Sequence, residues 1–308
     1  MLTVPVDLVW QGRAPLVVLG EIPAEVLAAT PTWDEAIGRH ARRTSLVPLD
    51  SIPLDDRALG LIGAIHHMTR CGSTALLRQF AALEGLAGVS EPMIFFKLCN
   101  RLEVDSALAA PRVRRLISLF RDGLAPVAER MVIKWPTLLC RWADLLAAAL
   151  PEVPMVFIHR RPDEVLASIE ARPLGNVHDL PPRLLAGPQD DPAQVAPTDG
   201  LAAIVAALAA NCRWIAQVPS VRRLDFTELP QAGWRDVAPF FGITPTAEQL
   251  SAMQSEAARD AKNRNRAFVP DSMGKRVTAS PDAQRLASEV LAPALAEVTS
   301  NLASVRDN

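Results

Sequence analysis

Short, almost uninterrupted apolar segments alternate with helical patterns, and this alternation constrains the fold more than any other feature of the sequence. Residues 61–66 (LIGAIH) and 154–159 (PMVFIH) are nearly continuous in apolar residues. Such runs are typical of strands in a parallel sheet that is covered on both faces. Further strands are predicted at 87–90, 130–134 and 221–226. The sequence therefore predicts an α/β fold with a doubly wound parallel sheet flanked by helices.

Helical periodicity fills the intervals between these strands. We expect helices at 73–86, 105–124, 137–149, 163–171, 200–217, 234–241, 246–262 and 281–304. In a doubly wound sheet, ligands bind beyond the carboxyl ends of the strands. The following segments are therefore expected to meet at one edge of the sheet: 67–74, 90–92, 134–137 and 159–162.

Two regions depart from this regular pattern. Residues 1–57 are predicted to be an N-terminal extension of unknown role, packed on a main domain of residues 58–308. The extension contains two segments with strand character (DLVWQ and PLVVLGEI) and a short helical one (TWDEAIGRHARR). Residues 172–199 are rich in proline, aspartate and glycine. A loop this long favours a lid or a binding loop, and a flexible insertion is the alternative.

Composition argues against several classes of protein. A net charge of -2 over 308 residues gives no sign of a nucleic-acid partner. No apolar stretch reaches the ~18 residues of a membrane span, and the first residues lack the pattern of a signal peptide. The 4 cysteines are widely spaced and form no CxxC pair, so neither a metal site nor a disulfide framework is expected. These features predict a reduced, cytoplasmic protein, and they do not indicate its oligomeric state.

Residues 69–74 (TRCGST) lie between a predicted strand and a predicted helix. A glycine turn at the start of a helix binds anions, because free backbone N–H groups and the helix dipole favour negative charge there. The guanidinium of Arg70 adds a positive charge with several N–H donors. Gly72 allows the backbone to approach a phosphate closely, and Ser73 and Thr74 offer hydroxyls. The alternative is a simple helix cap with Arg70 in solvent. The turn is not a Walker A loop, since no lysine follows the glycine.

This turn resembles the P-[RK]-S-G-T-T signature of PAPS-dependent sulfotransferases of the bacterial type. Thr69, Cys71 and Ser73 depart from it. Three more segments match family motifs. HRRPDEVLAS is similar to R-[DN]-P-x-[DE]-V-x-x-S, and MVIKWP is similar to V-x-K-x-P. LDFTELPQAGWRDVAPFFGI is similar to the segment Y-E-D-L…F-L-G, with Phe226 in place of tyrosine. Together the matches cover roughly residues 61 to 245.

The resemblance implies a sulfotransferase fold and a reaction. A sulfuryl group would move from PAPS to a hydroxyl of a small molecule or sugar, leaving 3′-phosphoadenosine 5′-phosphate (PAP), without a metal. By resemblance, the catalytic residues would be Arg70, Glu91 and Lys134, with Glu91 as the base, as in the glutamate-using branch. The residues that contact the nucleotide would be Arg70, Cys71, Gly72, Ser73, Thr74, Arg160 and Ser168. Lys275 and Arg276 are further candidates for phosphate contacts, in a basic segment that is not the family's R-K-G motif, and a disordered basic loop is the alternative.

Alternatives remain open at this point. Glu91 could instead cap the helix that begins near Pro92, and His67 is a second candidate for the base. Lys134 could be a strand-end lysine that extends to solvent. Arg160 and Arg161 could pair with nearby carboxylates in a solvated cluster. At the level of function, the alternatives are a kinase-like enzyme that uses ATP and a sulfotransferase-fold protein that binds without turnover.

Overall fold

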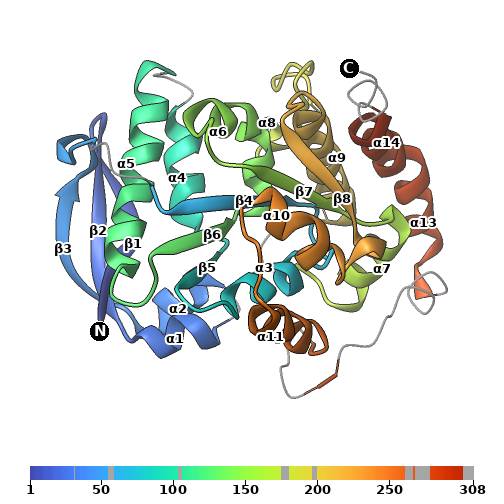
Figure 1. Ribbon diagram of the computed structural model, residues 1–308. Helices are drawn as coiled ribbons and strands as arrows, with labels where there is room; N and C mark the ends of the chain where they lie inside the picture. Colours follow the sequence, from blue (N-terminus) through green and yellow to red (C-terminus); the bar gives the residue numbers. More distant parts are fainter. Residues whose placement is uncertain are drawn as a thin grey trace.

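Five parallel strands form the central sheet of the protein (Figure 1). The computed structural model describes residues 1–30, 32–54, 59–102, 106–174, 180–195, 200–260, 266–267 and 278–300. The strands lie in the order β5-β6-β4-β7-β8, and each neighbouring pair is parallel. Their bounds are β4 Leu61–His67, β5 Leu86–Ser90, β6 Arg130–Lys134, β7 Met155–His159 and β8 Val221–Asp225. The predicted doubly wound parallel sheet is confirmed.

Helices cover both faces of this sheet (Figure 1). The crossover from β4 to β5 carries α3, and the crossovers that lead from β5 through β6 and β7 to β8 carry α4 to α9. The helices between the strands are α3 Ser73–Ala81, α4 Met93–Leu102, α5 Ser106–Leu124, α6 Ala143–Ala149, α7 Pro162–Ala171, α8 Pro182–Leu185 and α9 Gly200–Ala216. Those after β8 are α10 Ala238–Phe240, α11 Ala247–Ala257, α13 Pro281–Leu286 and α14 Ala292–Ser300. Short 3-10 helices lie at Leu49–Ser51, Thr137–Trp142 and Phe226–Glu228, and π-helical turns at Gly233–Val237 and Ala287–Leu291.

The sequence indicated a helix near Pro92 only as a segment that Glu91 could cap, and α4 begins there, at Met93. Its first residues include an isoleucine and two phenylalanines, which are weak helix formers. The backbone N–H of Met93 donates to Oδ1 of Asp34 at 3.3 Å, so the first turn is held by a side chain far away in the sequence. The extent of α4 and this contact were not predicted, because they depend on packing between distant residues.

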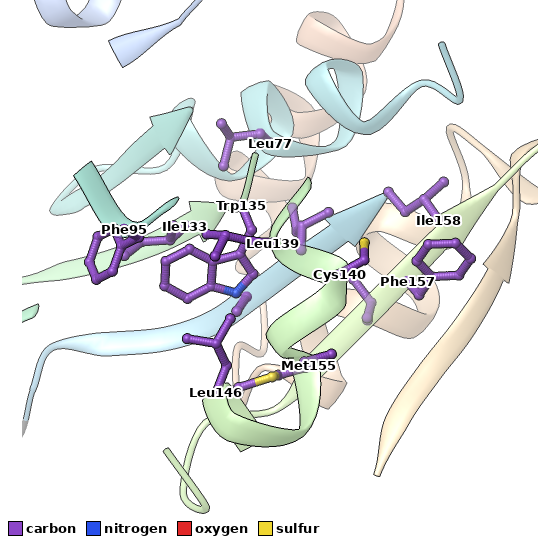
Figure 2. Close-up of a cluster of buried hydrophobic side chains, with 14 of the residues drawn as sticks. Leu77, Phe95, Ile133, Trp135, Leu139, Cys140, Leu146, Met155, Phe157 and Ile158 are labelled. Carbon is purple, nitrogen blue, oxygen red and sulfur yellow. The ribbon is translucent and has the colours of Figure 1, made fainter. Parts of the chain in front are cut away.

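The core lies on both sides of the sheet and includes a cluster around Trp135 (Figure 2). Trp135 is fully buried, and its ring meets the ring of Phe95 edge-on at 4.9 Å between centroids. Because Trp135 directly follows β6, this packing fixes the carboxyl end of that strand. The residue just before it, Lys134, is thereby held at a defined place at the edge of the sheet.

A second, smaller sheet precedes the main one. Strands β1 Leu2–Gln11, β2 Ala14–Ile22 and β3 Arg42–Pro48 are antiparallel, and helices α1 Ala24–Ala29 and α2 Trp33–His40 lie between β2 and β3. The two expected strands and the expected helix are present, whereas β3 was not predicted, since its residues are mostly exposed and carry no alternating pattern. Strand β1 packs against α4 and α5, which joins this sheet to the main body.

Part of the 172–199 segment is packed against the main domain. Leu184 and Leu185 of α8 are buried, and the helix lies against α9. The carbonyl oxygen of Ala186 accepts a hydrogen bond from Nε1 of Trp214 at 3.0 Å and another from Arg141 at 3.3 Å. Residues 184–187 are buried and anchor the segment, whereas residues 189–195 are mostly exposed.

Candidate active site

The carboxyl ends of β4, β7 and β8 meet around one aromatic ring, that of Phe226. A Cβ atom placed on Gly72 would lie 2.9 Å from Cδ2 of this ring. The guanidinium carbon of Arg160 lies 3.9 Å from the ring centroid. The turn after β4 and the strand end of β7 are thus brought to a common neighbour, as the order of the strands predicted.

The turn after β4 has an unusual backbone. Gly72 has φ +82° and is the residue that precedes the first turn of α3. A side chain there would be strained and would also meet Phe226 and Leu229, so glycine is required on both counts. Gly72 occupies the N-cap position of α3 and makes no side-chain cap bond. The N–H groups of Ala75 and Leu76 donate to the Gly72 carbonyl at 2.9 and 3.2 Å. The positive end of the helix dipole still lies at this turn, which suits it to an anion.

Arg70 is half-buried, and its side chain reaches the end of α7. Its Nη2 donates to the carbonyl oxygen of Arg172 at 2.7 Å, and its Nε is buried without a hydrogen-bond partner. Desolvation, and to a lesser extent the charge of Arg172, lower the pKa of Arg70, while Glu91 opposes the shift. A buried donor without a partner is a position where a ligand oxygen would be stabilised.

Lys134 and Glu91 form a close ion pair at the neighbouring strand ends. The Lys134 side chain is 1% exposed, its Nζ lies 2.6 Å from Oε1 of Glu91, and it donates to Oγ1 of Thr74 at 3.1 Å. The alternative of a lysine that extends to solvent is therefore wrong. Because Thr74 belongs to the first turn of α3, this network connects the carboxylate of Glu91 to the turn after β4. The Glu91 side chain is 33% exposed, so its carboxylate is accessible to a reactant.

Two residues of this cluster have a backbone conformation that side chains disfavour. Among the described residues, Arg70 with φ 61° and Glu91 with φ 53° are the non-glycine residues with positive φ. Each such conformation costs about 1–3 kcal/mol and persists where the surroundings impose it, as at ligand sites. The backbone N–H of Glu91 donates to the carbonyl of Lys134 at 2.7 Å, which helps to fix the residue in this conformation.

His67 is held in the interior beside the ion pair. Its Nε2 lies 3.0 Å from the carbonyl oxygen of Trp135, and its Nδ1 lies 3.4 Å from Oγ1 of Thr137. Because a carbonyl only accepts hydrogen bonds, Nε2 carries the proton. Desolvation lowers the pKa of His67 to about 4, with Glu91 opposing the shift and Lys134 adding to it. His67 is buried and neutral at pH 7, and its Nε2 also lies 3.7 Å from Oε1 of Glu91, so its ring borders the ion pair while Glu91 is the more exposed of the two.

Arg160 lies in a buried ion pair at the end of β7. Its Nε donates to Oε2 of Glu164 at 2.7 Å, and the two side chains are 4% and 2% exposed. Arg161, in contrast, is exposed and pairs with Asp163 at 2.9 Å. The alternative of a solvated charge cluster therefore describes Arg161 but not Arg160. Ser168 lies half-buried further along α7.

The other residues predicted to contact the nucleotide include Cys71, Ser73, Lys275 and Arg276. The Cys71 side chain is fully buried, and desolvation raises the pKa of its thiol to about 12. Cys71 can thus meet a ligand only through its backbone. Ser73 is also largely buried. Lys275 and Arg276 lie outside the described residues.

Asp34 belongs to this neighbourhood and was missed by the sequence analysis. It accepts from Met93 N–H at the start of α4, and its pKa is raised, chiefly by desolvation, with Glu91 among the further causes. No sequence signal marks it, because the contact joins α2 to a residue nearly sixty positions away.

Within the described ranges, no group of three or more His, Cys, Asp or Glu side chains could hold a metal ion. None of the described helices is long and apolar enough to cross a bilayer.

Comparison with known proteins gives a limited answer. No family model matches the sequence, and no curated protein matches it. The crystal structure of sulfotransferase STF1 from Mycobacterium tuberculosis H37Rv is similar, with 14% identity over 78% of each chain and a TM-score of 0.38. At this level of similarity, a functional assignment depends on the geometry of the site.

Proposed function

We propose that the chain is a sulfotransferase that moves a sulfuryl group from PAPS to the hydroxyl of a small molecule. The observation that carries this proposal is the cluster of Arg70, Lys134 and Glu91 around the first turn of α3. It combines two cations, a partly exposed carboxylate and a helix N-terminus at the carboxyl end of the central strand. Sulfuryl transfer, like phosphoryl transfer, depends mainly on positioning and on charge stabilisation, which such a cluster supplies.

The donor set fits a nucleotide that carries two anionic groups. The buried Nε of Arg70 and the start of α3 suit the 5′-phosphosulfate, since both offer N–H donors. At the end of β7, the pair with Glu164 fixes the Arg160 guanidinium through Nε, and the terminal nitrogens would meet the 3′-phosphate. The Phe226 ring between Gly72 and Arg160 sets the spacing of these two anion sites.

Each member of the cluster would have one task in the reaction. When bound, PAPS supplies an activated sulfuryl group with PAP as the leaving group. Glu91 would accept the proton of the acceptor hydroxyl as its oxygen bonds to sulfur. Lys134, held between Glu91 and Thr74, would stabilise negative charge on the transferring group. Arg70 would stabilise the leaving phosphate oxygen as its bond to sulfur breaks.

Calorimetric binding of PAP without added metal tests the nucleotide site. We expect micromolar binding to the wild type and loss of binding in Arg70→Ala. Because Arg160→Ala would take from the buried Glu164 its partner at 2.7 Å, the matching variant is the double replacement Arg160→Met/Glu164→Met, which keeps the buried volume. Arg161→Ala, which removes the exposed neighbour, is the control and should bind PAP as the wild type does.

The same titration separates the proposed function from its alternatives. Binding of PAP together with transfer from PAPS to an acceptor supports a sulfotransferase. Binding of PAP without transfer to any acceptor would identify a non-catalytic protein. Absence of PAP binding, with binding of ATP and magnesium instead, would overturn the proposal in favour of a kinase-like enzyme.

A further inference from the structure

A cavity of about 370 Å³ lies between the N-terminal residues and the main sheet. It extends along the whole of β5, the edge strand, from Leu86 to Ser90. Strand β5 forms one wall of the cavity and α3 forms a second. Residues of β1, α1 and Trp33 of α2 form a third. Its volume is within the range of about 300–1,000 Å³ that is typical of small-molecule sites.

One end of the cavity lies beside the reactive cluster. Thr74 and Ser90 both line it. Thr74 accepts the hydrogen bond of Lys134 Nζ, and Ser90 lies opposite Lys134 in the pairing of β5 with β6. Ser90 also directly precedes Glu91. The Oγ atom of Ser90 is buried and has no hydrogen-bond partner. A polar group of a ligand could supply the missing hydrogen bond.

The rest of the lining is mainly apolar. Its charged members are Glu25, which is exposed, and Arg78, which is half-buried. The Nε1 atom of Trp33 already donates to the carbonyl of Pro5 at 3.2 Å, so what this side chain adds to the wall is chiefly its ring. A sugar in this cavity would lose the hydration of many hydroxyls without replacement, whereas an apolar molecule gains by burial.

We infer that this cavity binds the acceptor and that the acceptor is an uncharged apolar molecule with one hydroxyl, which points to the Thr74–Ser90 end. This inference rests on the proposed function and specifies its substrate class. The acceptor oxygen forms a bond to sulfur, the bond from sulfur to the PAP oxygen breaks, and Glu91 takes the hydroxyl proton. The N-terminal residues thereby gain a role as a wall of the acceptor site.

The test uses 2-naphthol as the apolar probe and glucose as the polar one. Ala87→Phe places a ring into the cavity from β5, and Ala81→Trp narrows it from the exposed end of α3. Ala148→Phe, on an exposed position of α6, is the matched control. We expect 2-naphthol binding at least tenfold weaker in the two filled variants, unchanged binding in the control, and unchanged PAP affinity in all three. Transfer from PAPS should favour 2-naphthol over glucose.

Several outcomes would overturn the inference without affecting the nucleotide site. These are PAP binding with no 2-naphthol binding, equal 2-naphthol binding in the filled variants, or preferred transfer to glucose. Should Ala87→Phe not fold, Ala81→Trp decides, because its side chain lies on the surface. If PAP itself fails to bind the wild type, the proposed function falls and the assignment of an acceptor falls with it.

Discussion

The turn after β4 and the turn after β7 each place an arginine at the end of a buried strand, but they hold it differently. Arg70 has a positive φ, is half-buried and leaves a buried donor without a partner. Arg160 is fixed by a buried carboxylate and an aromatic ring. The first arrangement is strained and incomplete, whereas the second is neutralised and rigid. The difference suggests that the chemistry occurs at the first turn and that the second serves to hold the ligand in place.

The largest expected effect comes from removing the carboxylate of Glu91, which follows β5 and is linked to the turn after β4 through Lys134 and Thr74. In Glu91→Gln, the side chain keeps its shape but cannot accept a proton, so kcat for transfer from PAPS should fall by about 10²–10⁴. Binding of PAP should remain near the wild-type affinity. Steady-state kinetics and calorimetry measure the two quantities. Glu84→Gln, an exposed glutamate just before β5, is the control. A rate close to that of the wild type in Glu91→Gln would remove Glu91 from the mechanism.

The second turn should instead lose stability when it is broken. Glu164→Gln leaves Arg160 buried beside an uncharged partner, and removing one member of a buried pair costs about 3–5 kcal/mol. Arg161→Ala breaks an exposed pair with Asp163, which is worth about 0–1 kcal/mol, and a longer contact of 3.9 Å with Glu164, so it should cost less than Glu164→Gln. Urea unfolding of both variants gives the comparison. Equal losses in the two variants would mean that the Arg160–Glu164 pair is as well solvated as its exposed neighbour.

A smaller effect separates two causes at Gly72. Gly72→Ala suffers from its positive φ and from the contact with Phe226, whereas Gly85→Ala has a similar φ of +72° with no atom within 4 Å of the new Cβ. Gly85→Ala should cost about 1 kcal/mol, and Gly72→Ala more, by about 1–2 kcal/mol. Thermal or urea unfolding measures the difference. If the two variants lose the same free energy, Phe226 moves away readily and does not fix the spacing of the two turns.

The parts of the molecule that the sequence predicted are those with a local cause. The strands 61–66 and 154–159 were readable because a sheet covered on both faces demands continuous apolar runs. The extent of helix α4, the positive φ of Glu91 and the role of Asp34 were not, because each depends on contacts between residues distant in the chain. The convergence of the strand ends followed from topology, but the burial of Lys134 and Arg160 required the side-chain packing to be known.

The smallest effect, a pH dependence, also distinguishes the two turns. Burial lowers the pKa of His67 to about 4, while His159, at the end of β7, has a lowered pKa whose shift Asp225 and Glu228 oppose. Between pH 6.5 and 4, His67 therefore takes up a proton in the unfolded chain but not in the folded one. Stability rises with pH where the unfolded chain binds more protons, so it must fall as the pH drops through this window.

His67→Asn removes this proton uptake and should reduce the loss of unfolding free energy between pH 7 and 5.5 by about 1 kcal/mol. His159→Asn should reduce it by less, because the two neighbouring carboxylates keep the charged form of His159 more accessible. Urea titrations at the two pH values measure these differences, and the effect of each replacement on stability at pH 7 cancels. A larger change in His159→Asn than in His67→Asn would reverse the order, and would mean that the interior beneath the first turn is wetter than that beneath the second.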